Sequence, residues 1–266
     1  MTIKIAIAGA RGRMGTAAVQ AINEASDMEL VAILDYKYEG MYLHGSDVTD
    51  TPGGVPIYET LESLTADTLP DVLLELTNPD AVYKNMHDAL TYGIRPVVGT
   101  SGLSLKSISQ LAELADEKRI GGIIAPNFSI GAVLMMKFSA MAARYLNDVE
   151  IIEMHHDQKI DAPSGTAMKT AEMIMDVREP HCQGHPGEKE TEEGARGADI
   201  DGMKIHSVRL PGFLAHQQVL LGAPGEMLTI RHDSFDRKCF MPGVLLAIRE
   251  VMKKESLIYG LENIIE

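Results

Sequence analysis

The run EMHHDQKIDAPSGT, near the middle of the chain, gathers groups that can transfer a proton and bind an anion. His155 and His156 are adjacent, and histidine is the side chain whose charge ordinarily changes near neutral pH. Lys159 adds a compact positive charge. The Pro-Ser-Gly-Thr segment is typical of a helix start, so backbone N–H groups at Gly165 and Thr166 could bind a carboxylate. The run therefore predicts a site that holds an anion and moves a proton.

A second group of residues, GARGRMG, has the spacing of a nucleotide-binding loop. Gly9, Gly12 and Gly15 follow a strand-like run and open a helical segment. The first glycine permits a tight turn, the second lets a pyrophosphate approach the backbone, and the third lets the helix pack on the strand. Asp35 lies 20 residues past Gly15, at the end of the next strand-like run, where an acidic side chain should hold a ribose hydroxyl. The pattern predicts a dinucleotide site.

The residues around this loop leave the choice of nicotinamide cofactor open. Asp35 favours NADH, because it would pair with the 2′-hydroxyl and repel a 2′-phosphate. Lys37 and Arg13 could each neutralise that phosphate, which favours NADPH. We expect the protein to use both cofactors. The loop residues expected to bind them are Gly9, Ala10, Arg11, Gly12, Arg13 and Met14.

Two further loops follow strand-like runs, where a doubly wound sheet places its ligands. They end the runs PVVGTS and GGIIAPNF, and both could line the nicotinamide half of the cofactor site. Their candidate residues are Gly99, Thr100, Ser101, Ala125, Pro126, Asn127 and Phe128.

The elements that must position these residues follow two different patterns. Apolar runs separated by helical segments predict a parallel, doubly wound α/β sheet of the Rossmann type in the first part of the chain; the runs lie at 3–8, 29–34, 72–76, 96–99 and 121–125. The later part predicts an α+β region with a mostly antiparallel sheet, from strand-like runs at 149–155, 203–210, 216–222 and 226–231. Helices are expected at 130–146, at about 164–178 and at about 238–254, and a polar loop at 179–202.

The histidine pair should lie at the end of the strand expected at 149–155. Neighbouring side chains of a strand point to opposite faces of the sheet. If the strand persists through both residues, one of His155 and His156 would face the nicotinamide and the other would reach the substrate.

The composition narrows the class of partner. The chain has 266 residues and a net charge of −14, which argues against nucleic acid or an anionic membrane as its main partner. Neither a signal peptide nor an apolar stretch of membrane-spanning length is visible. Two cysteines, Cys182 and Cys239, do not make a disulfide framework. We expect a cytoplasmic protein that binds an anionic small molecule in a locally basic pocket.

GARGRMG, VVGTSG, APNFSIG and above all EMHHDQKIDAPSGTA resemble dihydrodipicolinate reductases, and the likeness spans nearly the whole chain. The resemblance implies a dinucleotide-binding domain at 1–127 with 239–266, and a substrate-binding domain at 128–238 whose sheet builds a homotetramer. It implies reduction of a cyclic dicarboxylic imine, 4-hydroxy-tetrahydrodipicolinate, by NADH or NADPH in diaminopimelate and lysine biosynthesis. Carried onto this chain, His155 is the proton donor or acceptor and Lys159 the second acid. His156, Gly165 and Thr166 then bind the substrate carboxylate.

Alternative interpretations remain open at this point. HCQGH, with His181, Cys182 and His185, could bind a metal, but it lacks a second ligand pair at usable spacing, so we expect no metal. A non-catalytic protein that senses nicotinamide nucleotides would keep the glycine loop without needing paired histidines. A sugar or amino-acid dehydrogenase of the same fold would lack the HHDQKIDAPSGT run. Roles for Arg237 and His216 stay undecided.

Overall fold

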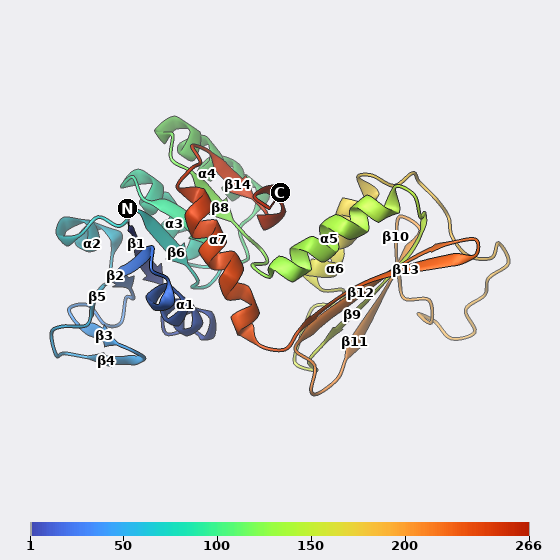
Figure 1. The fold of residues 1–266 in the computed structure, drawn as a ribbon, viewed down its shortest axis with the longest axis horizontal. Helices are drawn as coiled ribbons and strands as arrows, with labels where there is room; N and C mark the ends of the chain where they lie inside the picture. Colours follow the sequence, from blue (N-terminus) through green and yellow to red (C-terminus); the bar gives the residue numbers. More distant parts are fainter. Residues whose placement is uncertain (1, 266) are drawn as a thin grey trace. The chain divides into compact units, whose positions relative to one another are not determined.

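The computed structural model describes residues 2–265, and the chain divides into two compact units. The first unit contains the chain up to Ser129 together with the segment from Phe240, and the second contains Ile130–Cys239 (Figure 1). Each unit has its own sheet. Their roles in binding nucleotide and substrate remain predictions.

The first unit is built on a nine-stranded sheet in the order β14-β8-β7-β6-β1-β2-β5-β3-β4. All neighbours pair in parallel except those of β3, which pairs antiparallel with both β4 and β5. The strands are β1 (Ile3–Ala8), β2 (Met28–Leu34), β3 (Tyr42–His44), β4 (Asp47–Thr49), β5 (Val55–Tyr58), β6 (Val72–Glu75), β7 (Arg95–Val98), β8 (Gly122–Ile124) and β14 (Leu257–Tyr259). Strand order reverses between β1 and β6, which is where doubly wound folds bind their ligands.

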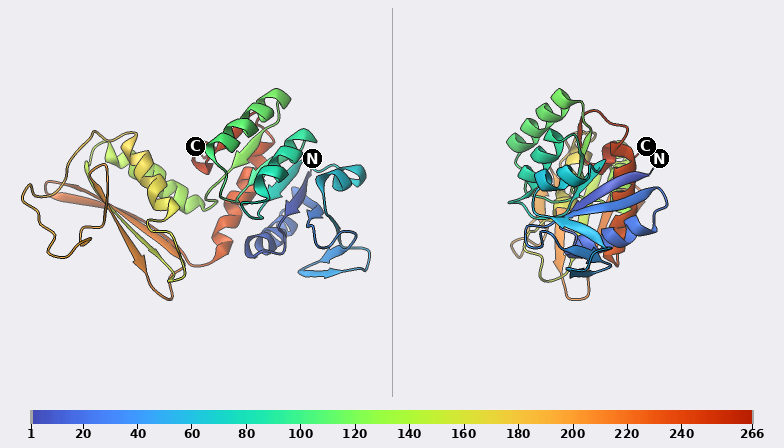
Figure 2. Two further views of the ribbon diagram at one scale, coloured as in Figure 1. Left: turned by 180° about the vertical axis from the view of Figure 1, so that it is seen from behind. Right: turned by 90° about the vertical axis from the view of Figure 1, so that its left-hand side faces the viewer.

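Helices cover both faces of this sheet, as the end-on view in Figure 2 shows. Helices α1 and α7 pack together on one face, and α3 and α4 pack together on the other. The helices of the unit are α1 (Arg13–Glu24), α2 (Leu61–Asp67), α3 (Val82–Thr91), α4 (Leu105–Lys118) and α7 (Met241–Val251), with a short 3₁₀ turn at Leu261–Asn263. The predicted Rossmann-type sheet is therefore confirmed.

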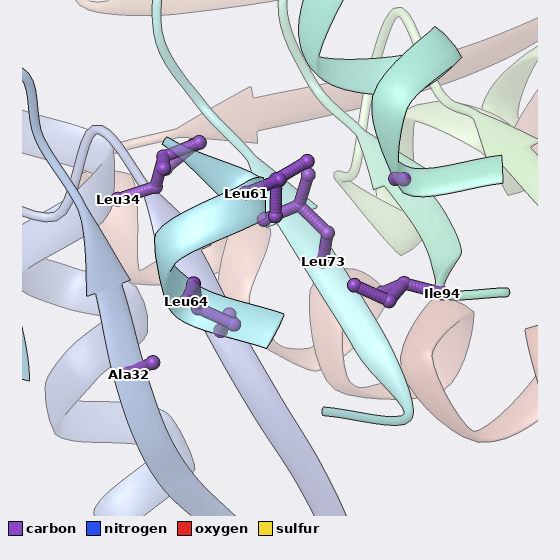
Figure 3. Close-up of a cluster of buried hydrophobic side chains, with 9 residues drawn as sticks. Ala32, Leu34, Leu61, Leu64, Leu73 and Ile94 are labelled. Carbon is purple, nitrogen blue, oxygen red and sulfur yellow. The ribbon is translucent and has the colours of Figure 1, made fainter. Parts of the chain in front are cut away.

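Burial explains why these strands read as continuous apolar runs. Strand β1 is covered on both faces, and Ile5, Ala6, Ile7 and Ala8 are all fully buried. A cluster beside it joins strand residues to the short helix α2 (Figure 3); its members are Ala6, Ala8, Ala32, Leu34, Leu61, Leu64, Leu73, Ala89 and Ile94. Helix α2 begins where the Thr60 side chain accepts a hydrogen bond from the N–H of Ser63.

The second unit carries a five-stranded sheet in the order β10-β11-β9-β12-β13. Strands β9 and β11 pair in parallel, and the other neighbours are antiparallel, which confirms the predicted mostly antiparallel sheet. Helices α5 and α6 pack together against one face of it (Figure 1). The elements are α5 (Ile130–Ala143), β9 (Asp148–His155), α6 (Gly165–Met175), β10 (Ala198–Ile200), β11 (Met203–Arg209), β12 (Ala215–Ala223) and β13 (Glu226–Ser234).

Several expectations need correction. The segment 179–202 is not wholly a loop, because β10 forms within it and pairs with β11. Arg178 holds this segment by donating hydrogen bonds to the carbonyls of His181 (2.7 Å) and Asp201 (3.3 Å). The last helix is shorter than expected, since a 3₁₀ turn at Arg237–Phe240 precedes α7. Within residues 2–265, no helix is both long and apolar enough to cross a membrane.

Candidate active site

The glycine loop lies between β1 and α1, beside the end of β6. Gly9 has φ of +85°, and a Cβ there would lie 2.6 Å from the carbonyl oxygen of Leu76. A Cβ on Gly15 would collide with the backbone of Gly9 and Ala10. At Gly12 a Cβ would meet only the Gly9 carbonyl oxygen, at 3.3 Å. Gly9 and Gly15 are thus required by the turn and the packing, whereas the surface over Gly12 is open to a ligand.

The start of helix α1 suits an anion. Gly12 is its N-cap residue and supplies no side-chain cap, and the first turn contains no acidic residue. Helix N-termini attract phosphate through their N–H groups and dipole. Together with the adjacent point of strand reversal, this arrangement fits the pyrophosphate of a dinucleotide.

Asp35, directly after β2, was expected from the sequence, but its ion pair with Arg11 was not. Arg11 donates from Nε to Oδ2 of Asp35 at 2.8 Å, and its guanidinium lies over the Tyr38 ring, 4.2 Å from the centroid. The backbone N–H of Lys37 donates to Oδ1 of Asp35 at 3.1 Å. Arg13, in contrast, is the first residue of α1 and is exposed. Arg11 is therefore the glycine-loop cation that the structure places on Asp35.

The two candidate nicotinamide loops leave adjacent strands, β7 and β8, at the same edge of the sheet. The Phe128 ring packs against Gly99, where a Cβ would lie 2.7 Å from Cε2 of the ring. Asn127 accepts the N–H of Ser129 at 2.8 Å. Among the described residues, the buried Oγ1 of Thr100 has no hydrogen-bond partner. A buried hydroxyl with this unmet capacity fits a ligand at this edge.

A further polar group at this edge was missed from the sequence. Glu75, the last residue of β6, is fully buried, and its Oε1 accepts hydrogen bonds from the N–H and hydroxyl of Thr77 and from Asn85. Its Oε2 has no partner within the part of the chain that is described. The signal was a carboxylate inside the apolar run VLLEL, where burial is expected on both faces.

In the second unit, β9 ends at His155, so the strand does not persist through His156. The side chain of His155 is 14% exposed, and its Nδ1 lies 2.6 Å from Oε2 of Glu153. His156 begins a turn that is closed by the N–H of Lys159 donating to the His156 carbonyl at 3.2 Å. The expected opposite orientation of the two histidines does not apply, because strand alternation stops between them.

Lys159 forms an ion pair with Asp161, which was not expected from the sequence. Its Nζ lies 2.6 Å and 2.8 Å from the two carboxylate oxygens of Asp161. The hydrogen bond from Lys159 lowers the pKa of Asp161. The side chain of Asp161 is 59% exposed, so this pair is accessible to solvent and weakly held.

Helix α6 begins directly after this turn. Ser164 is its N-cap and accepts the N–H of Ala167 at 3.2 Å, and Gly165 is the first helical residue, followed by Thr166. A Cβ built on Gly165 meets nothing within 4 Å. Packing within the chain therefore gives no reason for a glycine at this helix start.

Beneath these residues lies a buried ion pair that sequence reasoning missed. Glu153 is fully buried, and Arg209 at the end of β11 donates to both of its oxygens, at 2.7 Å and 2.8 Å. Burial alone would raise the pKa of Glu153, but hydrogen bonds from His155 and Arg209 outweigh burial and lower that pKa to about 2. The available signal was a glutamate at an inward position of β9, in line with Val149 and Ile151.

The structure also places three residues whose roles the sequence left open. Gln217 on β12 pairs in register with Glu153, and its neighbour His216 points to the opposite face of the sheet. His216 is buried, and its Nδ1 lies 2.7 Å from Oδ1 of Asp233. Arg237 lies in the 3₁₀ turn before α7. His181 pairs with Asp148 at 2.9 Å. Over residues 2–265, no three His, Cys, Asp or Glu side chains gather as metal ligands.

Comparison with known proteins shows the family to which the chain belongs. Two family models match in succession, described as dihydrodipicolinate reductase N-terminus at residues 3–128 and C-terminus at residues 131–265. The 4-hydroxy-tetrahydrodipicolinate reductase of Lysinibacillus sphaericus is 57% identical over 265 residues and is covered completely, as is this chain. The reductase of Bacillus pumilus is 58% identical, over 100% of this chain and 98% of that protein.

A solved structure gives the same result. The dipicolinate-bound dihydrodipicolinate reductase from Paenisporosarcina sp. TG-14 superimposes with a TM-score of 0.91 at 54% identity, and the match covers 100% of both chains. The resemblance inferred from the glycine loop and the HHDQKIDAPSGT run is thereby confirmed. The chain belongs to the dihydrodipicolinate reductase family.

Proposed function

We propose that this protein reduces 4-hydroxy-tetrahydrodipicolinate to tetrahydrodipicolinate with NADH or NADPH, in the diaminopimelate and lysine pathway, and that His155 and Lys159 deliver the proton. The proposed reaction rests on 57% sequence identity, over the full length of the chain, to a protein named 4-hydroxy-tetrahydrodipicolinate reductase. The site residues are our inference, supported by the way in which one chain segment joins a histidine, a lysine and a helix N-terminus.

The first unit supplies the cofactor site in this account. The open surface over Gly12, the start of α1 and Asp35 would hold the adenosine and pyrophosphate part, and the loops after β7 and β8 the nicotinamide. When bound, the cofactor supplies a hydride. Its acceptor is an electron-poor carbon conjugated with the ring nitrogen, so negative charge develops on the nitrogen side of the substrate.

His155 is positioned to quench that charge. Its Nδ1 is engaged by Glu153, which leaves Nε2 as the nitrogen that can donate a proton to the substrate. Lys159 acts as the second acid and as a fixed positive charge. Its exposed partner Asp161 is a carboxylate that a substrate carboxylate can replace at the same ammonium.

The substrate carries two carboxylates, and the protein carries a net charge of −14. Binding therefore depends on local positive groups. Lys159 supplies a cation, His156 supplies a ring N–H donor, and Gly165 and Thr166 supply the positive end of the α6 dipole. The open space over Gly165 lets an anion approach the helix start.

Gly165→Val tests this dicarboxylate site. The added side chain should fit within the protein but obstruct the anion, so the inhibition constant of pyridine-2,6-dicarboxylate should rise at least about tenfold, the loss expected for one charge-assisted hydrogen bond. Nucleotide affinity should stay unchanged. Gly222→Val is a matched control in the same unit, where a Cβ meets nothing closer than 3.8 Å. Unaltered inhibition in Gly165→Val would remove the helix start from the substrate site.

Cofactor choice should depend on Lys37. The Lys37→Ala variant should have a higher Michaelis constant for NADPH, by several-fold, with a smaller change for NADH, because only NADPH carries the 2′-phosphate that needs a cation near Asp35. Steady-state kinetics with both cofactors at saturating substrate measure this directly. Equal changes for the two cofactors would exclude Lys37 from the phosphate site.

We also infer a cytoplasmic homotetramer assembled through the sheet of the second unit. The edge strand β13 supports this inference, because Met227 and Leu228 are 68% and 41% exposed in the isolated chain. An edge strand with exposed apolar side chains is suited to pairing with another copy.

A further inference from the structure

We propose that Glu153, paired with Arg209, is the positioning residue of the catalytic site: it fixes the orientation of the His155 ring and sets which nitrogen of that ring faces the substrate. This inference rests on the proposed role of His155 and adds two residues that act through it.

The contacts of Glu153 tie together three separate elements. Its Oε2 accepts hydrogen bonds from Nδ1 of His155, at 2.6 Å, and from Nη1 of Arg209, at 2.8 Å. Its Oε1 accepts hydrogen bonds from Nη2 of Arg209, at 2.7 Å, and from the backbone N–H of Ser164, at 3.1 Å. Arg209 Nη2 also donates to the carbonyl of Asp161 at 2.7 Å. The end of β9, the turn that carries Lys159 and the start of α6 are therefore all held by one buried carboxylate–guanidinium pair.

The ionised state of Glu153 determines the tautomer of His155. Hydrogen bonds from His155 and Arg209 overcome the effect of burial and lower the pKa of Glu153 to about 2, so the carboxylate is charged at neutral pH. An ionised carboxylate can only accept hydrogen bonds, so Nδ1 of His155 must be the donor. Nε2 is then the nitrogen left for proton transfer, and it donates a proton to the substrate when both ring nitrogens are protonated.

The charged groups around Glu153 come from few elements. They are His155 on β9 and Arg209 on β11, with Asp161 reached through Arg209. Helix α6 contributes an N–H group and β12 contributes the uncharged Gln217 at the paired position. Removing the charge of Glu153 would therefore leave His155 beside the unpaired cation of Arg209.

A similar cluster on the same strand provides a control. Glu150 accepts a hydrogen bond from Nη2 of Arg196 at 2.6 Å and lies 2.8 Å from Nε2 of His206. It differs from Glu153 in two ways: its side chain is 28% exposed, and it lies three residues earlier on β9. By strand alternation it points to the other face of the sheet. Glu150→Gln makes the same chemical change, next to an arginine and a histidine, away from the catalytic turn.

The experiment compares Glu153→Gln, the double variant Glu153→Gln/Arg209→Gln and Glu150→Gln. In Glu153→Gln, kcat should fall on the order of 10²-fold, as expected when a catalytic histidine loses its orienting carboxylate. The inhibition constant of pyridine-2,6-dicarboxylate should change less than about threefold, well below the tenfold expected from one lost charge-assisted hydrogen bond. Glu150→Gln should keep the wild-type kcat and inhibition constant.

The double variant separates catalysis from folding. Removing both charges should return the melting temperature toward the wild-type value, since no buried charge is left unpaired, while kcat stays low because His155 still lacks its carboxylate partner. Recovery of activity together with stability would overturn the inference, and so would wild-type behaviour of Glu153→Gln. If Glu153→Gln behaves as wild type while His155→Ala loses activity, this inference alone fails. A fully active His155→Ala variant would overturn the proposed proton donor as well.

Discussion

Lys159→Met should lower kcat/KM for 4-hydroxy-tetrahydrodipicolinate by at least about 10²-fold, the lower end of what a lost general acid costs. Methionine keeps most of the length of the side chain and removes its charge, so the change tests electrostatics rather than packing. The variant should also bind pyridine-2,6-dicarboxylate more weakly, because the ammonium that now pairs with Asp161 is the cation available to a substrate carboxylate. Steady-state kinetics and competitive inhibition measure both effects.

Lys204→Met is the matched control for this change. Lys204 also pairs with an aspartate, Asp199, at 2.8 Å in the same unit, but it lies on β11 beside β10 and outside the catalytic turn. It should retain the wild-type rate. If Lys159→Met binds the dicarboxylate and turns over like the wild type, the charge is not used, and the mechanism is wrong.

Removing Arg209 should cause a large loss of stability that depends on pH. Arg209→Met leaves Glu153 buried without its guanidinium, and breaking a buried pair in this way costs about 3–5 kcal/mol at neutral pH. Urea unfolding at equal protein concentration measures this loss. Arg231→Met is the control, because that arginine is 51% exposed in its pair with Asp233, and its loss should cost no more than about 1 kcal/mol.

The pH dependence follows from the lowered pKa of Glu153. In the wild type this group has a pKa of about 2 instead of its usual 4.5, which contributes about 3 kcal/mol above pH 4.5 and is lost as the pH falls toward 2. In Arg209→Met the carboxylate is buried without that partner and becomes protonated at higher pH. The two unfolding free energies should therefore converge on acidification. A difference that stays constant from pH 7 to pH 3 would contradict this origin.

Local patterns predicted most of the first unit. The apolar strands, the glycine loop and the acidic residue at the end of β2 are each readable within a short window, because continuous burial and tight turns impose composition directly. The short elements β3, β4, β5, α2 and β14 escaped, since three to seven residues are too few to show a pattern of their own, and β14 depends on its pairing with the distant β8. The pairing of Asp35 with Arg11 likewise depends on how the loop turns.

The segment that we propose as catalytic stands out by its residue types, but the residues that support it do not. His155, Lys159 and Gly165 lie in one run, whereas Glu153 and Arg209 are 56 positions apart and meet only because β9 and β11 pair in parallel. Such register is a tertiary property that no local window contains. The end of the predicted strand at 155 agrees with β9, and the turn that follows begins at His156.

The central claim is tested most directly by the steady-state oxidation of NADH and of NADPH with enzymatically generated 4-hydroxy-tetrahydrodipicolinate. We expect the wild type to oxidise both cofactors when this dicarboxylate is present, and pyridine-2,6-dicarboxylate to inhibit competitively with it. We expect His155→Ala to lose at least about 10²-fold in kcat. Three results would contradict the proposed function: nucleotide binding without turnover, equal activity on a sugar such as galactose, or unchanged activity in His155→Ala.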